Sequence, residues 1–139
     1  MIPPMDYDPL YVQFIYYFNE QRDYFECHEV LEELWLEEGR NPIYQGLLQV
    51  AVGLYHFRNE NISGAIKLFQ GAVEKLKGTG HIVLGIHMDL IVSEVEAYVG
   101  KLQNYDASPL AFYDLTIKIA DNELEQLVQQ CVKHPPSQQ

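Results

Sequence analysis

The stretch Asp23–Glu38, DYFECHEVLEELWLEE, predicts an amphipathic helix with a signal at each end, and the other predicted elements can be arranged around it. Asp23 is a favourable N-cap, and Glu26 stands three residues later, which is the spacing of a capping box. Gly39 follows where a left-handed residue commonly ends a helix. One broad face of this helix is apolar and comprises Tyr24, Cys27, Leu31, Leu34 and Trp35. We expect this face to pack against other helices.

His28 lies beside that apolar face, and Glu32 follows at the i,i+4 spacing that brings two helical side chains together. Glu29 is expected to point away from His28 into water, with the other acids of the outer face. A carboxylate beside an imidazole can fix the tautomer of the ring or share a metal ion with it. Two interpretations remain open: a hydrogen bond that braces two helices at the rim of the core, or a functional pair.

The composition is that of a single acidic domain. At 139 residues, with 47% apolar residues, the chain is long enough to bury a core and too apolar to stay disordered. Twenty acidic residues against nine basic residues give a formal net charge of −11. Nucleic acid and anionic membranes both require a positive surface, so we expect neither as a partner. A basic or cationic partner is compatible with this charge.

The sequence predicts a cytoplasmic protein. The N-terminal residues MIPPMDYDPL have neither the basic nor the apolar region of a signal peptide. No apolar run approaches the length of a membrane span, and even the richest, Leu47–Phe57, contains Gln49 and His56. The two cysteines, Cys27 and Cys131, lack metal-ligand or redox spacing, and we expect Cys27 to be a buried free thiol.

The remaining sequence predicts further helices joined by polar or glycine-containing turns. Caps, prolines and apolar periodicity place them at about 9–20, 43–58, 62–77, 88–102 and 122–132. Residues 81–87 are expected to form a loop. Residues 115–119 alternate as in a strand but have no second strand to pair with, so we predict an extended strap over the helices.

Helix 43–58 is apolar on nearly every side, which is typical of a helix at the centre of a fold. Its polar exceptions, Gln45, Gln49 and His56, lie within about 40° of one another on the helical wheel. They form either the one solvated edge of this helix or a polar seam that faces the histidine and glutamate of the preceding helix, because buried polar groups need partners.

The predicted fold class is all-α, a compact bundle of about five or six helices built from antiparallel helical hairpins. Gly53, Ala65, Phe69 and Ala72 match the spacing of small and bulky positions in a tetratricopeptide hairpin. Two hairpins are too few for a solenoid, so this spacing indicates hairpin packing and not a peptide-binding array. We expect one domain over residues 1–139, with its C-terminal helices within 88–134.

Several segments form a fairly specific motif in combination. They are Phe25–Trp35 (FECHEVLEELW), Tyr44–Ala51 (YQGLLQVA), the pair Tyr55-His56, the pair Gly64-Ala65, and Leu68. Over about residues 14–78 the chain resembles the domain-of-unknown-function family 309. The resemblance implies a small all-helical protein without an established activity, in places labelled a predicted metal-dependent hydrolase because of its histidine–glutamate motif. Carried over by position, the motif residues are His28, Glu29, Glu32, Trp35, Gln49 and His56.

The metal interpretation can be compared with known ligand sets. A zincin needs two histidines in H-E-x-x-H, whereas Glu32 stands here in place of the second histidine. His28 and Glu32 can supply two ligands and His56 a third, which leaves an open position for water on a divalent metal such as zinc. Metal-dependent hydrolysis is the one enzyme class with support, and no catalytic residue can be named. The predicted binding residues are His28, Glu32, Trp35, Gln45, Gln49 and His56.

A non-catalytic function is the alternative. In this interpretation the protein is a helical-hairpin module for protein–protein interaction and forms a homodimer. The aromatic face of the first helix would be its contact surface, formed by Tyr11, Tyr16 and Tyr17.

Overall fold

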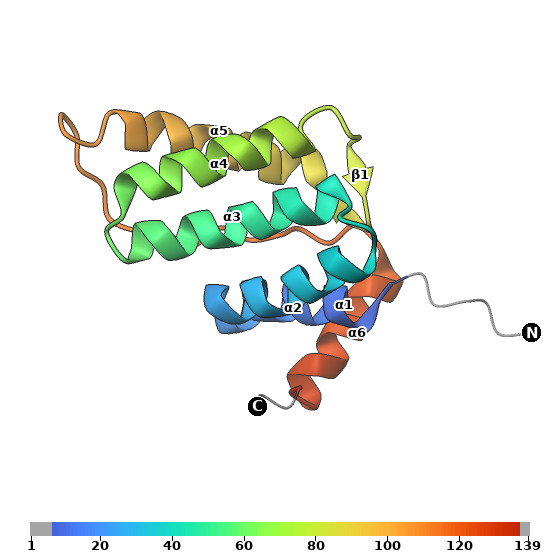
Figure 1. Ribbon diagram of the computed structural model, residues 1–139. Coiled ribbons are helices and arrows are strands. Elements are labelled where there is room, and N and C mark those ends of the chain that lie inside the picture. The colour runs from blue at the N-terminus through green and yellow to red at the C-terminus, as the bar shows by residue number, and fades with distance from the viewer. Residues whose placement is uncertain (1–6, 137–139) are drawn as a thin grey trace, which may run out of the picture.

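The computed structural model describes residues 7–136, which form six α-helices, one π-helical turn and one short hairpin (Figure 1). In chain order the elements are α1 (Pro9–Tyr16), the π-helical turn η1 (Tyr17–Gln21), α2 (Tyr24–Glu37), α3 (Pro42–Arg58), α4 (Ile62–Leu76), β1 (Ile82–Val83), β2 (Ile86–His87), α5 (Met88–Gln103) and α6 (Asn122–Lys133). The predicted all-α class is confirmed.

Each helix from α1 to α4 packs against the next helix in the sequence, and α6 returns to pack against α1. Figure 1 shows α3, α4 and α5 stacked in one half of the molecule, with α1, α2 and α6 in the other half. Short polar turns between consecutive helices favour this arrangement, because they send the chain back alongside the helix just completed. The predicted bundle of packed helices is therefore confirmed.

Side-chain caps start four of the helices at the residues that the sequence indicated. Asp8, Asp23, Asn41 and Asn61 each accept a hydrogen bond from a backbone N–H in the first turn of the following helix, at 2.9–3.1 Å. Gly39 has a φ of +67° just after α2, which is the left-handed conformation predicted there. Local signals thus place the helix boundaries to within a residue or two.

The first helix contributes its aromatic side chains to the core. Tyr11, Tyr16 and Tyr17 are all buried, and burial raises the pKa of the Tyr11 phenol. The Tyr11 hydroxyl donates a hydrogen bond to the backbone oxygen of Leu84 at 2.8 Å. The predicted contact surface on this helix is therefore wrong. Tyr11 also lies against Tyr44 of α3, at a ring-centroid distance of 6.2 Å, so segments beyond the first helix cover it.

Glycines in α3 allow a close approach of α4. A Cβ atom added at Gly53 would lie 2.5 Å from Cε1 of Phe69, and one added at Gly46 would lie 2.7 Å from Cδ2 of Leu76. Either distance is too short for a real contact, so the two helix surfaces fit together only without side chains at these positions. The small-and-bulky spacing noted in the sequence is this α3–α4 packing.

Residues 110–120 cross the helices as an extended strap, as the sequence predicted for residues 115–119. Asn19 holds the strap through two hydrogen bonds: its Nδ2 donates to the oxygen of Ile117, and its Oδ1 accepts from the Ile117 N–H, both at 2.8 Å. The side chain thereby satisfies both backbone groups of one residue that has no strand partner.

The segment predicted as a loop, residues 81–87, contains the antiparallel β1–β2 hairpin, so that prediction is wrong in part. Ile82 pairs with His87 and Val83 with Ile86, and Ile86 also forms a bridge to Ile119 of the strap. Strands of two residues are too short to leave an alternating pattern in the sequence. Among the helices of residues 7–136, none has both the length and the apolar character needed to cross a bilayer.

Candidate functional site

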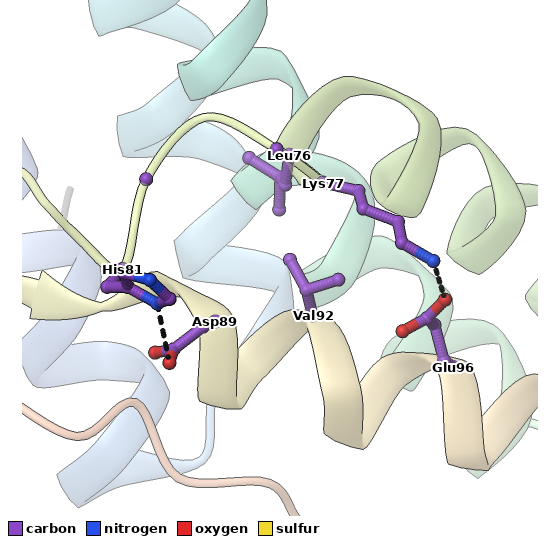
Figure 2. A pocket seen from close by; sticks show the side chains of 8 residues that line it. Leu76, Lys77, His81, Asp89, Val92 and Glu96 are labelled. Atoms are coloured by element: carbon purple, nitrogen blue, oxygen red, sulfur yellow. Dashed lines mark hydrogen bonds and ion pairs between the residues drawn. The ribbon is translucent and has the colours of Figure 1, made fainter.

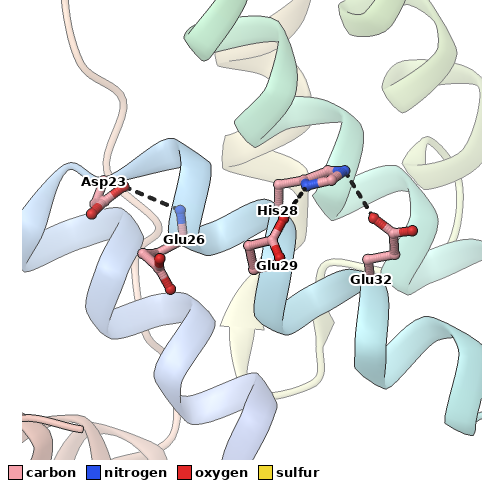
Figure 3. A network of polar contacts seen from close by, with 5 residues as sticks. All are labelled: Asp23, Glu26, His28, Glu29 and Glu32. Atoms are coloured by element: carbon pink, nitrogen blue, oxygen red, sulfur yellow. Dashed lines mark hydrogen bonds and ion pairs between the residues drawn. The ribbon is translucent and has the colours of Figure 1, made fainter. Parts of the chain in front are cut away.

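The imidazole of His28 lies between two acidic side chains of its own helix, α2 (Figure 3). Its Nε2 is 2.9 Å from Oε2 of Glu32, and its Nδ1 is 3.2 Å from Oε1 of Glu29. The contact with Glu32 agrees with the i,i+4 spacing. The prediction that Glu29 turns away from His28 is wrong, because its flexible stem lets the carboxylate reach the ring while most of the side chain stays in solvent. We call these three residues the His28 cluster.

The protonation state of His28 decides which of these contacts are hydrogen bonds. Only the imidazolium can donate from both ring nitrogens, whereas the neutral ring donates from one and presents a lone pair at the other. All three side chains are partly or largely exposed, so water screens their charges. Exposed pairs of this kind contribute about 0–1 kcal/mol to stability, and the His28 cluster is therefore available for other contacts at little cost.

His56 lies in the last turn of α3, where it contacts Asn61 and Tyr55. Its Nδ1 lies 3.2 Å from Nδ2 of Asn61, and its ring meets Tyr55 edge-on at 6.1 Å. Across residues 7–136, no three His, Cys, Asp or Glu side chains gather closely enough to hold a metal ion. The predicted three-ligand set of His28, Glu32 and His56 is accordingly not assembled in this arrangement.

The other predicted binding residues point in different directions. Gln49 lies against α4, since a Cβ atom added at Gly71 would be 3.0 Å from its Nε2. The Trp35 ring is partly buried with the Arg40 guanidinium 5.6 Å from its centroid, and Gln45 is partly buried. Two buried polar atoms of the described chain have no hydrogen-bond partner, Trp35 Nε1 and Gln49 Oε1. Gln49 thus belongs to the α3–α4 interface and not to a seam facing His28.

The His28 cluster lies on an open surface. Five of the cavities among residues 7–136 have volumes of about 280–490 Å³, and none of these five is lined by a predicted binding residue. A polar pocket between α2 and α3 is not one of them. The side chains of His28, Glu29 and Glu32 are 38%, 53% and 45% exposed.

Two large apolar side chains flank the His28 cluster on the same face of α2. Phe25 is 53% exposed and Leu36 is 51% exposed. With Glu29 and Glu32 between them, they follow an i, i+4, i+7, i+11 pattern, which is one line along a helix. The sequence did contain a signal for them, because both residues fall outside the apolar arc of the helical wheel. Phe25 still contacts the ring of Tyr55 on α3, at a centroid distance of 6.3 Å.

The fold and this surface define a small all-α protein of packed helical hairpins with a charged, histidine-containing outer face on α2. The family model described as "Domain of unknown function (DUF309)" matches residues 11–68, from α1 into α4. The uncharacterized protein YpuF of Bacillus subtilis (strain 168) is 30% identical over 125 residues, which cover 86% of this chain and 70% of that protein. The chain belongs to the DUF309 family.

Proposed function

We propose that the protein is a non-catalytic helical interaction module that contacts its partner through the outer face of α2. The exposure of Phe25 and Leu36 on either side of the His28 cluster carries this proposal. Apolar side chains exposed beside polar ones are common at protein–protein contacts. Leu36 follows Phe25 by eleven positions, which is about 16 Å along the helix axis and a length that one partner helix or strand can cover.

The charge of this face favours a basic partner. Glu29 and Glu32 present partly exposed carboxylates between the two apolar side chains, on a chain with a formal net charge of −11. A lysine or arginine flanked by apolar residues would complement this pattern and would be steered toward it. In a two-fold pairing of α2, Phe25 would meet Leu36 of the partner subunit, but the carboxylates would also face their own copies. That repulsion weighs against the homodimer that the sequence predicted.

A hydrolytic function is supported less well, because the donor set does not fit a catalytic metal. A catalytic zinc site has three protein ligands and an open position. His28 and Glu32 offer one nitrogen and one carboxylate oxygen at 2.9 Å, and His56 is held elsewhere. We therefore assign no catalytic step. A divalent cation held by His28 and Glu32 alone, with water as its other ligands, is the second candidate function.

Site-specific photo-cross-linking tests the interaction module. A photoreactive residue placed at Leu36 should form adducts with a basic protein, whereas one placed at Leu90, an exposed leucine on α5, should not. Binding of the captured protein should then weaken with Leu36→Ser and with the double variant Glu29→Gln, Glu32→Gln, and should fall with rising salt. Equal adducts from both positions would contradict the proposal, and adducts to a second copy of this chain would establish the homodimer instead.

Calorimetric titration of untagged protein with zinc tests the second candidate. Binding should be lost in His28→Ala and retained in His56→Ala, because of these two histidines His28 contacts a carboxylate and His56 contacts the Asn61 amide. Wild-type protein that takes up no zinc, or a loss of binding in both variants, would overturn the two-residue cation site.

A further inference from the structure

A cavity of about 360 Å³ lies between the C-terminal end of α4 and the first turns of α5, far in sequence from the His28 cluster (Figure 2). Its middle is apolar, because Leu76 of α4 and Val92 of α5 point toward one another there, and both are buried. The glycine-containing turn after α4 forms one side of the cavity. The volume is sufficient for a small organic molecule.

An ion pair closes each end of this cavity. At one end, Lys77 Nζ lies 2.8 Å from Oε2 of Glu96, and at the other end His81 Nδ1 lies 3.3 Å from Oδ2 of Asp89 (Figure 2). Both carboxylates belong to α5, whereas the Lys77 ammonium group and the His81 imidazole belong to the end of α4 and the turn after it. The cavity therefore has a carboxylate and a nitrogen-containing side chain at either end, with an apolar stretch between.

The two carboxylates are held at a fixed spacing, whereas their partners are loosely held. Asp89, Val92 and Glu96 follow an i, i+3, i+7 pattern, so they share one face of α5, with the two acids about 10.5 Å apart along its axis. The side chains of Lys77 and His81 are 65% and 92% exposed. Exposed ion pairs contribute little, so a ligand can displace these two groups easily.

We propose that this cavity binds a linear aliphatic diamine or polyamine. One ammonium group would replace Lys77 at Glu96, the other would replace His81 at Asp89, and the methylene chain would lie on Leu76 and Val92. The formal net charge of −11 raises the local concentration of cations around the protein. A ligand of the same length with a negative charge at each end would be repelled by the carboxylates of Asp89 and Glu96. The cavity should therefore bind the dication and not the dianion. This inference is independent of the function proposed for α2.

Titration of the full chain with ligands matched in length and differing in charge tests this inference. Chemical-shift changes in an NMR titration should show diaminooctane binding at α5 at least about tenfold more tightly than octylamine or diaminobutane. Octylamine has one charge, and diaminobutane has four fewer methylene groups to lie on Leu76 and Val92. Octanedioate, the dicarboxylate of the same length, should not bind. Equal affinity for the three amines, or binding of octanedioate, would overturn the assignment.

Three variants separate this site from a general attraction of cations to an acidic protein. Glu96→Gln should weaken diaminooctane binding about tenfold, and Glu74→Gln, which removes the same charge from an exposed position on α4 outside the cavity, should not. Lys77→Ala should strengthen binding, because it removes the internal competitor for Glu96. Weaker binding in Lys77→Ala, or equal losses in the two glutamine variants, would refute the proposal.

Discussion

The substitution Gly53→Ala probes how closely α3 packs against α4. The added Cβ would lie 2.5 Å from Cε1 and 2.6 Å from Cδ1 of Phe69, both well inside the range of real carbon contacts. Phe69 cannot easily move, because its ring is fully buried and packs against Tyr98 with a centroid distance of 5.1 Å. The alanine therefore has to displace core side chains or push the two helices apart.

Two opposing effects set the expected magnitude. Replacing glycine by alanine within a helix stabilises a protein by about 0.5–1 kcal/mol, because it restricts the unfolded chain. Overpacking a well-packed core costs about 1–3 kcal/mol. The added methyl group would overlap the buried ring of Phe69, so the overpacking cost should lie in the upper part of that range. We expect Gly53→Ala to lower the free energy of unfolding by about 1–2 kcal/mol.

Urea denaturation followed by far-UV circular dichroism measures this change, with Gly100→Ala as the matched control. Gly100 lies exposed in α5, and a Cβ added there has no heavy atom of a neighbouring group within 4 Å. The same substitution should therefore raise stability by about 0.5–1 kcal/mol at this site. A Gly53→Ala protein as stable as wild type, or a shift of the same sign in both variants, would refute the close packing of α3 and α4.

Three further predictions concern the core and the strap. Cys27 is buried, and burial raises the pKa of its thiol. A thiol reagent should therefore label Cys131 in the native protein and Cys27 only on unfolding. Equal labelling rates for the two cysteines would contradict this prediction. Burial raises the pKa of the Tyr98 phenol to about 12. The contribution of Tyr98 to the free energy of unfolding should therefore be complete below about pH 10 and should be lost as the pH rises toward 12. Denaturation of wild type and of Tyr98→Phe across this pH range measures that loss. Asn19→Ala should lower the free energy of unfolding by about 2 kcal/mol, because it leaves the two backbone groups of Ile117 without their hydrogen-bond partner. Thermal or urea unfolding measures this change, and an unchanged stability would show that Asn19 does not hold the strap.

Signals that act over a few residues were enough to place the helices. Asp23 and Asn41 cap α2 and α3 as expected, and Gly39 takes the left-handed conformation between them. The contact of His28 with Glu32 also followed from spacing, because the helical period brings residues four apart to the same side whatever surrounds them. Each of these features depends on the geometry of a single helix or turn.

Only the tertiary structure shows which residues of different helices contact one another. The alternative interpretation expects Tyr11, Tyr16 and Tyr17 at a contact surface, but all three are buried, because a helical pattern does not reveal which neighbours cover a face. His56 and Gln49 share one side of α3, yet the first is held at the turn into α4 and the second lies against Gly71. Distances within a helix are set by its period of 3.6 residues, whereas distances between helices depend on their crossing angles and on rotamers chosen by the whole core. The candidate metal ligands lie on two helices, and for that reason their spacing in the sequence did not place them together.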